Sequence, residues 1–380
     1  MRTEDPLTWV DVQSDTKFLA RQLPALSSLA VETKRHVEAG LIHPADALQQ
    51  AAQKGAVPLD VIRVCLENYA NRLSKANYQE PATMVREKPM AVTVLEQLWQ
   101  HDHDWFRLVL VDLEATGWLC FLAVVEGLDD LVLTWVKTEL PKALAVRTKR
   151  EVENSLWRNM LFRNLIDATL SNIANQKADK ALAIFFDMAE ARSALLAEVP
   201  PARGMVPFER SSPRQEYMDK DTMEKLGMPS WARISLWPAA CAITAKLTRG
   251  EFPRTTPTMF DRYLGYMIRY PHKGSPSQQE FTIARLYLEH PERPSAHDLY
   301  NFFRKRLHGR SDEEIQASLP RDEAGRSIWG QTLRNGIRVA RLNHDYKNAA
   351  WLLGMYRNMP LLWPEHPGKF ATDHEQVLKL

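Results

Sequence analysis

Two short polar strings are the parts of this chain that come nearest to a metal-binding or catalytic motif. The HDHD string contains His101 and His103, but the apolar spacing around it is helical and points them about 200° apart, so they do not share one ion. The GLDD string places Asp129 and Asp130 where acidic residues complement the dipole at a helix start. No GxGxxG, GxxxxGK[ST], GxSxG or HExxH motif occurs. We therefore expect no enzyme, no metal and no cofactor, with a catalytic site assembled from distant residues as an alternative.

The cysteines and the apolar runs exclude several other classes of protein. Cys65, Cys120 and Cys241 lie far apart without CxxC or CxH spacing, which argues against a disulfide framework and a zinc knuckle and fits a reducing compartment. The longest apolar run, near LCFLAVV, is far shorter than the roughly 20 residues of a membrane-spanning helix. The acidic N-terminal segment is unlike a secretory signal or an Arg-rich transit peptide. Cytoplasmic residence is the plain reading, with no membrane span.

Cations alternate with aromatic residues in two segments of the later chain. FDRYLGYMIRYPHKG contains Arg269 and Lys273, and YNFFRKRLHGR contains Arg304, Lys305 and Arg306. Cations neutralise phosphates and aromatic faces stack on bases, so both segments predict contact with nucleic acid. Two alternatives stay open, because tyrosines at helical spacing commonly form a core and a cationic run commonly ends a solvated helix.

The charge is distributed unevenly along the chain, although its net value is only +2. Residues 1–140 hold 13 Lys and Arg against 20 Asp and Glu, whereas residues 141–380 hold 36 against 27. A basic later part attached to an acidic first part predicts a polyanion-binding surface on the later part, with chance variation between solvated faces as the alternative.

The fold class follows from composition and periodicity. A 380-residue chain with 45% apolar and 25% charged residues fits a folded protein of two or three domains or one repeat array. Apolar residues recur at helical steps, strand-like alternation is scarce and Gly is low at 15, so we predict an all-α fold. The expected helices lie within 15–40, 43–55, 58–76, 90–117, 118–141 with a break at Gly127, 161–195, 230–250, 256–271, 275–291, 295–309, 327–343 and 345–359.

The segment around residues 164–191 predicts how these helices assemble. Two helices on either side of the hinge NQKADK each carry an apolar seam, and the two seams face each other. The first seam consists of Leu161, Leu165, Ile166, Leu170 and Ile173, and the second of Ala181, Ile184, Phe185 and Met188. Leu182, Phe186 and Leu195 leave the outer sides partly apolar, and leaving one Phe face exposed forgoes about 2 kcal/mol. Stacking of further hairpins on each side removes that cost. We therefore predict helical hairpins stacked as an α-solenoid with irregular repeats.

Two segments resemble the pentatricopeptide repeat. NLIDATLSN followed by DKALAIFFDMAEA matches the pattern of its two helices through Asn164, Leu165, Ile166, Asp179, Ala181, Leu182, Phe185 and Met188. The segment NGIRVARLNHDYKNAAWLLGMYRNM is similar through Asn335, Ile337, Ala349, Leu352, Leu353 and Met355.

The resemblance implies binding of single-stranded RNA in organelles, with the first helices of successive repeats lining a basic surface. A polar residue near the start of each first helix would read a base, which by position is Asn164 and Asn335, with Arg163, Arg334 and Arg338 beside them. An unstacked base offers hydrogen-bonding edges to an Asn amide, so this chemistry is physically reasonable.

These observations predict four regions: an acidic helical region at 1–140, repeat-like hairpins at 141–200, a Pro-rich linker at 201–229 and a basic helical-repeat region at 230–380. We expect an RNA-binding protein of mitochondrial transcript processing, stability or translation, with a protein partner at the acidic region. The expected location is the mitochondrial matrix, or otherwise the cytoplasm. The alternative is a protein-binding scaffold, such as an assembly factor or a mitochondrial ribosome-associated subunit, in which the eleven Trp residues serve as core or interface anchors.

Overall fold

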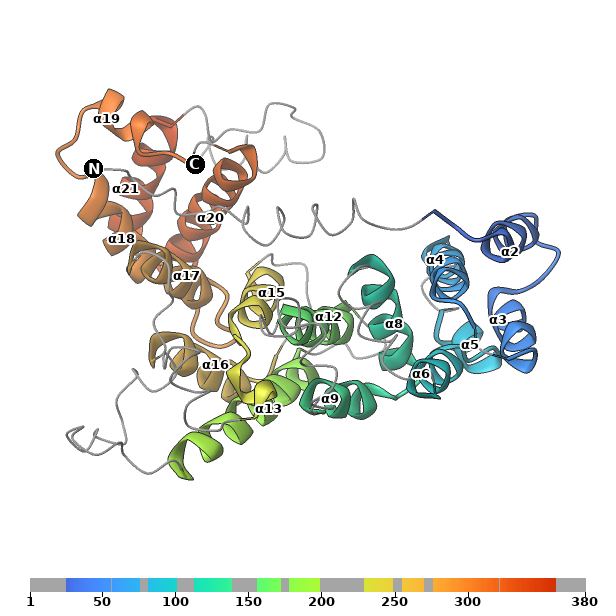
Figure 1. Cartoon of the computed structure of the whole chain (residues 1–380). Coiled ribbons are helices and arrows are strands. Elements are labelled where there is room, and N and C mark those ends of the chain that lie inside the picture. Colours follow the sequence, from blue (N-terminus) through green and yellow to red (C-terminus); the bar gives the residue numbers. More distant parts are fainter. Residues whose placement is uncertain are drawn as a thin grey trace. The chain divides into compact units, whose positions relative to one another are not determined.

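The computed structural model describes residues 25–55, 57–75, 81–100, 113–138, 156–171, 178–198, 229–248, 255–269, 276–320 and 322–359. These residues form sixteen α-helices and one 3-10 turn without a strand, which confirms the predicted all-α fold of stacked helical hairpins (Figure 1). No helix among them combines the length and the apolar character needed to cross a bilayer.

The chain divides into two compact units. The N-terminal unit is Val10–Ile243, and the C-terminal unit contains Thr244–Leu380. The division falls inside one helix, α15 (Trp237–Leu247). The Pro-rich segment 201–229, predicted as a linker, lies outside the described residues except for Pro229.

The N-terminal unit is built from nine α-helices and a 3-10 turn among the described residues before α15. They are α2 (Ser28–Glu38), α3 (Pro44–Gln53), α4 (Leu59–Lys75), α5 (Pro81–Glu87), α6 (Ala91–Gln100), α8 (Leu113–Val125), α9 (Asp129–Lys137), α12 (Leu156–Ser171), α13 (Asp179–Glu198) and η2 (Ser230–Arg233). The helix-start interpretation of the GLDD string is correct, because Asp129 and Asp130 form the first turn of α9. Asp129 also accepts a hydrogen bond from Lys180 Nζ at 2.7 Å, which ties α9 to α13.

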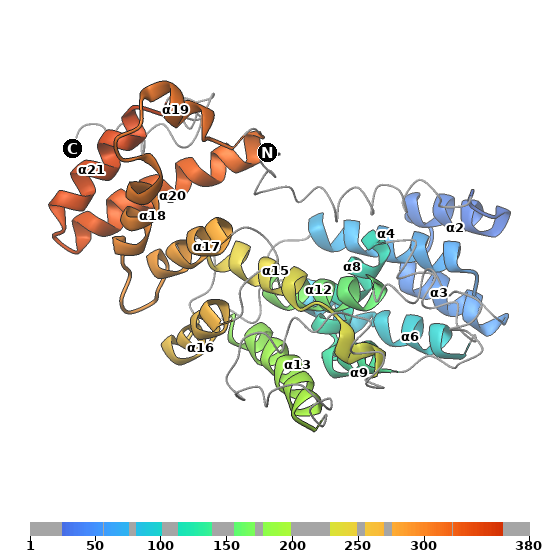
Figure 2. The ribbon, with the colours of Figure 1, turned by 60° about the vertical axis from the view of Figure 1, so that its left-hand side comes forward.

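The C-terminal unit stacks the remaining helices in chain order. They are α16 (Pro257–Arg269), α17 (Pro276–Leu288), α18 (His297–Leu307), α19 (Asp312–Ala317), α20 (Glu323–Leu342) and α21 (Tyr346–Arg357). Helix α17 packs on α16, α18 and α20, and α20 and α21 form a hairpin (Figure 2). Side-chain caps define the starts of the last three helices, since Ser311 and Glu314 form a capping box and Asp322 and Asp345 accept from backbone amides.

Three elements depart from the sequence-based prediction. Helices α5 and α19 were not predicted, since α5 lies between the helices expected within 58–76 and 90–117, and α19 lies between those expected within 295–309 and 327–343. Helix α8 runs through Gly117, where a break was expected. Ala115, Leu119 and Cys120 of this helix are fully buried and α8 packs against α12, so packing outweighs the low helix propensity of a single Gly.

The hairpin of α12 and α13 shows what covers the predicted apolar seams. Every described member of the two seams is buried, and the rings of Phe162 and Phe185 meet at 6.5 Å between centroids. The outer residues Leu182 and Phe186 are buried as well. Helix α12 also packs against α8 and α9, so neighbouring helices supply the cover that the hairpin lacks.

A fully buried arginine joins α12 to the end of α9. Arg158 donates from Nε to the Val136 carbonyl at 3.1 Å and from Nη2 to the Thr138 carbonyl at 2.7 Å. Its guanidinium lies 4.2 Å from the centroid of the buried Trp157 ring. A cation suits this place, because the last carbonyls of a helix carry partial negative charge and lack intrahelical donors.

The core of the C-terminal unit contains a cluster of aromatic rings at one end and a close contact between α18 and α20 at the other. The rings of Phe281, Phe302, Phe303 and Trp329 contact one another at 5.1–6.2 Å between centroids. Further along α20, Gly336 faces the buried Leu299 of α18, and a Cβ at this glycine would lie 2.5 Å from a Leu299 methyl carbon. The missing side chain therefore permits the close approach of α18 and α20.

This close approach predicts opposite effects for substitutions at two helical glycines. Gly336→Val should lower the free energy of unfolding by about 1–3 kcal/mol, because the added methyl groups overpack a filled core. Gly354→Ala is the matched control in α21, where a Cβ meets nothing within 4 Å. It should raise the free energy of unfolding by about 0.5–1 kcal/mol through helix propensity. Urea unfolding of the full chain measures both, and a Gly336→Val variant as stable as the parent would contradict the packing.

Candidate nucleic-acid interface

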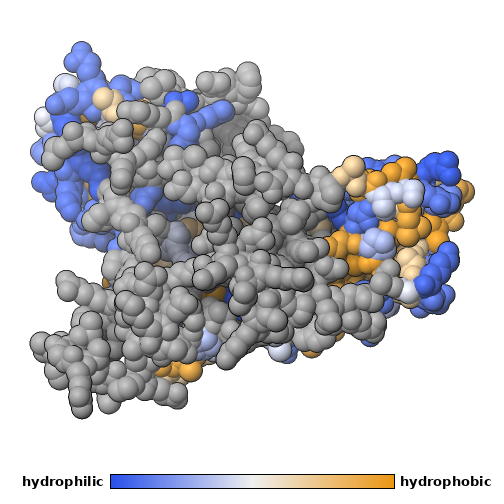
Figure 3. All heavy atoms as spheres, in the orientation of Figure 1, coloured by the Kyte–Doolittle hydropathy of each residue, from blue (hydrophilic) through white to orange (hydrophobic). Residues whose placement is uncertain are grey.

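The surfaces of the two units differ in character. Large apolar residues are exposed in the N-terminal unit, including Leu29 at 44%, Val31 at 54% and Leu41 at 75% (Figure 3). The visible atoms of the last helices are mainly hydrophilic (Figure 3). The exposed apolar residues of this part of the N-terminal unit are unlike a polyanion-binding surface, so the predicted basic residues are described next one by one.

The site residues predicted on α12 lie within a crowded helix. Arg163 and Asn164 are half-buried on α12, which packs against α8, α9 and α13. The side chain of Arg163 is 25% exposed, and its Nε lies 3.7 Å from a carboxylate oxygen of Asp167 one turn later. This pair presents little open surface to a long polyanion.

The cationic run on α18 is mostly engaged within the protein. Lys305 and Arg306 both bind the carboxylate of Glu280, at 2.9 and 3.3 Å. The hydrogen bond from Lys305, with Arg306 beside it, lowers the pKa of the Glu280 carboxyl below its ordinary value. Arg306 also lies 3.9 Å from the Phe302 ring centroid. Of the three cations in this run, Arg304 is the one that is exposed and has no carboxylate partner among the described residues.

The predicted basic and aromatic segment around α16 is divided between core and surface. Tyr263 is fully buried and its hydroxyl lies 2.8 Å from that of Thr244, so the core interpretation is correct for this tyrosine. Arg269 is exposed at the last position of α16. Lys273 and Tyr270 lie outside the described residues.

On α20, the structure brings Arg334, Asn335 and Arg338 together. Arg334 donates to the Tyr356 hydroxyl of α21 at 3.0 Å. The Asn335 amide oxygen accepts from Nε and Nη2 of Arg338 at 3.1 and 2.6 Å, and its nitrogen donates to a carboxylate oxygen of Glu289. Both ends of the Asn335 amide are therefore occupied, so reading a base edge would require exchange of one of these bonds.

Glu289 sets the electrostatics beside this network. Burial raises the pKa of its carboxyl above the ordinary value, while the charges of Arg338 and Arg285 and the hydrogen bond from Asn335 oppose the rise. The charge of Glu289 therefore interacts with the guanidinium groups of Arg338 on α20 and Arg285 on α17. Its charge reduces the attraction of this surface for a phosphate.

A third arginine extends the cationic face of α20. Arg334, Arg338 and Arg341 follow one another at steps of four and three residues, which places them on one side of the helix over about 10 Å of its axis. Among the described residues, none of the three forms an ion pair with a carboxylate. We call these three residues the α20 basic stripe. Sequence reasoning omitted Arg341, although the spacing in RNGIRVAR contains the signal.

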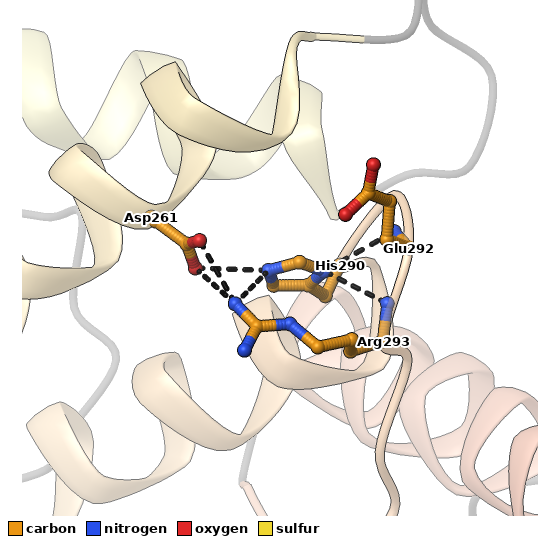
Figure 4. Close-up of polar contacts among 4 residues, drawn as sticks. All are labelled: Asp261, His290, Glu292 and Arg293. Atoms are coloured by element: carbon orange, nitrogen blue, oxygen red, sulfur yellow. Dashed lines mark hydrogen bonds and ion pairs between the residues drawn. The ribbon is translucent and has the colours of Figure 1, made fainter.

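One cluster in the C-terminal unit resembles a catalytic arrangement but leaves no nitrogen free to act. The buried His290 bonds Asp261 through Nε2 at 2.9 Å, and its Nδ1 accepts from the backbone amides of Glu292 and Arg293 at 3.2 and 2.9 Å (Figure 4). Arg293 also donates from Nη2 to both oxygens of Asp261, at 3.0 and 2.8 Å (Figure 4). Since both ring nitrogens are occupied, His290 serves as a clamp between α16 and the loop after α17 rather than as a base.

Metal-ligand groups and thiols are the remaining reactive groups within the part of the chain that is described. No group of three or more His, Cys, Asp or Glu residues there is placed to hold a metal ion, and the HDHD string lies outside it. Burial raises the pKa of Cys65 and of Cys241 to about 12, and it also raises that of Cys120. These thiols therefore stay protonated and weakly nucleophilic at neutral pH.

The clamp predicts a defined pH dependence. The hydrogen bond from His290 and the charge of Arg293 lower the pKa of Asp261, so the stabilisation is present above the ordinary Asp pKa of about 3.9 and is lost as the pH falls through the lowered value. Asp261→Asn should reduce the free energy of unfolding by up to about 1 kcal/mol at pH 7. The difference from the parent chain should shrink below about pH 4. Glu96→Gln is the exposed control, and equal losses in both variants at pH 7 would refute the clamp.

Comparison with known proteins does not assign a family to this chain. No protein-family model, no curated protein and no solved structure matches this chain. The resemblance of two segments to pentatricopeptide repeats therefore stays a prediction. The two segments lie in helix pairs, α12 with α13 and α20 with α21. Asn164 and Asn335, however, lie well inside α12 and α20 rather than near their starts, because these helices begin at Leu156 and Glu323.

Proposed function

We propose that this protein binds single-stranded RNA through its C-terminal unit and acts in mitochondrial transcript processing, stability or translation. The α20 basic stripe is the observation that carries the proposal. Its three guanidinium groups follow one helix face without an ion-paired carboxylate among the described residues, whereas the cations of α18 are largely neutralised by Glu280. Guanidinium groups bind phosphates in a bidentate manner and need no catalytic machinery to do so.

The stacked hairpins support this function for a geometric reason. Each hairpin presents a limited polar face, and consecutive helices place such faces next to each other. Here the packing of α17 on α20 brings Arg285 and Glu289 to the Asn335 network, so the basic surface draws on more than one helix. The mitochondrial setting rests on the resemblance of two segments to an organellar repeat family.

A protein-binding scaffold is the second candidate function, such as an assembly factor or a ribosome-associated subunit. The exposed apolar residues of the N-terminal unit, Leu29, Val31 and Leu41, favour it for that unit. The two functions are separable by crosslinking in cells. Recovery of transcripts supports RNA binding, and recovery of proteins without transcripts supports the scaffold.

The stripe predicts how RNA affinity depends on salt. Each lost phosphate contact should lower the slope of log affinity against log salt by about 0.7 in magnitude for a single strand. Arg338→Ala should therefore weaken binding of an oligouridine RNA and reduce the slope by about 0.7, and a variant that also carries Arg341→Ala by about 1.4. Fluorescence anisotropy between low and high salt provides the measurement.

Two controls make this prediction specific. Arg338→Lys keeps a positive charge and should retain the slope. Lys54→Ala removes an exposed cation from the N-terminal unit and should leave both affinity and slope unchanged. RNA binding that is insensitive to salt, or a slope unaltered by Arg338→Ala, would overturn the assignment of the stripe.

Removal of the negative charge of Glu289 should strengthen RNA binding, in contrast to removal of an arginine of the α20 basic stripe. Glu289→Gln keeps an oxygen that accepts from Asn335 but removes the negative charge that interacts with Arg338 and Arg285. Because a screened interaction of this kind is worth up to about 1 kcal/mol, RNA affinity should rise about two- to fivefold. Glu313→Gln on α19 is an exposed control of equal charge change. An equal rise in both variants would reduce the effect to net charge alone and contradict a local role for Glu289.

A further inference from the structure

An exposed aromatic pair lies at the turn between α20 and α21. Tyr346 is 63% exposed and the neighbouring Leu342 is 64% exposed, so the turn presents apolar surface to solvent. The ring of His344 meets that of Tyr346 at 6.0 Å between centroids and an interplanar angle of 62°, and its Nδ1 lies 3.1 Å from the Tyr346 hydroxyl. The tyrosine ring is therefore held in place at one edge while much of its surface stays open.

The backbone of this turn does not require a histidine. His344 has a φ of 59°, in the left-handed region that favours glycine. Its amide donates to the Arg341 carbonyl at 2.9 Å, and the next amide, of Asp345, donates to Ala340 at 2.8 Å, a helix-ending pattern in which glycine is the commonest residue at this position. Since glycine would form the same turn with less strain, the imidazole contributes through its side chain rather than through the turn.

The charges near the aromatic pair select the chemistry of its occupant. The α20 basic stripe ends at Arg341, three residues before His344, and the exposed Lys347 follows Tyr346 on the first turn of α21. Asp345 lies between His344 and Tyr346, and its carboxylate oxygens accept from the backbone and side-chain amides of Asn348 at 3.2 and 2.6 Å. An exposed aromatic ring with Arg341 and Lys347 on either side of it in the sequence matches a strand that carries anionic phosphates and unstacked bases.

We infer that Tyr346 is a stacking platform for one nucleobase of a bound single-stranded RNA, with His344 as the residue that positions its ring. The inference rests on the proposed RNA-binding function and adds the point where a base, rather than the phosphate backbone, meets the protein. Phosphates lie along the α20 basic stripe, and a base at the end of this path covers the open face of Tyr346. Stacking of this kind is tolerant of base identity, because every base has a π face.

The test uses the full chain and a 15-nucleotide oligouridine RNA, alongside the same RNA with abasic sites. Tyr346→Ala should weaken binding of the oligouridine by about tenfold, within the range found for loss of one stacked base. The salt slope should stay unchanged, because no cation is removed. Tyr346→Phe keeps the ring and should bind within about twofold of the parent chain. On the abasic RNA, parent and Tyr346→Ala should bind equally.

A second variant separates positioning from folding. His344→Gly should leave the melting temperature unchanged or raise it, because glycine suits the left-handed position. It should nevertheless weaken oligouridine binding by about threefold, since the tyrosine ring loses the contact at its edge. A loss of stability in this variant would assign His344 a merely structural part and contradict the positioning role.

The outcomes distinguish this inference from the function beneath it. If the parent chain binds oligouridine with a steep salt dependence and Tyr346→Ala binds equally well, the stacking platform is wrong and RNA binding stands. If the parent chain binds neither RNA, both are wrong. Loss of a protein partner by Tyr346→Ala, without any loss of RNA binding, would assign the turn to protein docking instead.

Discussion

The structure depends on one constraint, which is that a helical hairpin leaves apolar side chains on both of its outer faces. In α13, Leu182 and Phe186 are as deeply buried as the residues of the seam it shares with α12, and α12 itself is covered by α8 and α9. Each hairpin therefore needs neighbours, and stacking continues along the chain. The same requirement decides which residues remain for function, because a covered helix keeps only one open stripe. On α20, Arg338 is exposed on that stripe, with Arg334 and Arg341 half-buried beside it.

Several charged groups of the described residues pair with one another within the protein. Glu280 binds two cations of α18, Asp261 binds Arg293, and Asp129 binds Lys180. The basic character of residues 141–380 is therefore a poor measure of what a polyanion would meet. The informative quantity is the set of cations that have no carboxylate partner among the described residues, and on α20 three members of that set share one side of the helix. Glu289 affects these cations, because its half-buried negative charge interacts with Arg338 and lowers the attraction of that guanidinium for phosphate.

The hairpin of α20 and α21 combines a close helix contact, a group of cations and an exposed tyrosine. Gly336 allows close contact with α18, which holds α20 firmly against the core. The opposite side of the helix carries the cations, and the turn at its end carries an exposed tyrosine held by a histidine in a left-handed conformation. When the binding site is already rigid, the protein loses less conformational entropy on binding a flexible RNA strand. The arrangement supports both proposals, since phosphates and bases would meet different parts of one hairpin.

The sequence by itself determined the helical class, most helix positions, the buried seams of α12 and α13 and the helix start at Asp129, because periodicity and end signals are local properties. The resemblance of one segment to a known repeat also indicated Asn335, with Arg334 and Arg338 beside it. Only the tertiary structure decided that Asn335 is bonded to Glu289, 46 residues away, and that Lys305 is neutralised by Glu280, 25 residues away. The course of α8 through Gly117 depended on packing in the same way. Long-range partners compete for each polar group, and the winner depends on which helices lie side by side, which no local pattern contains.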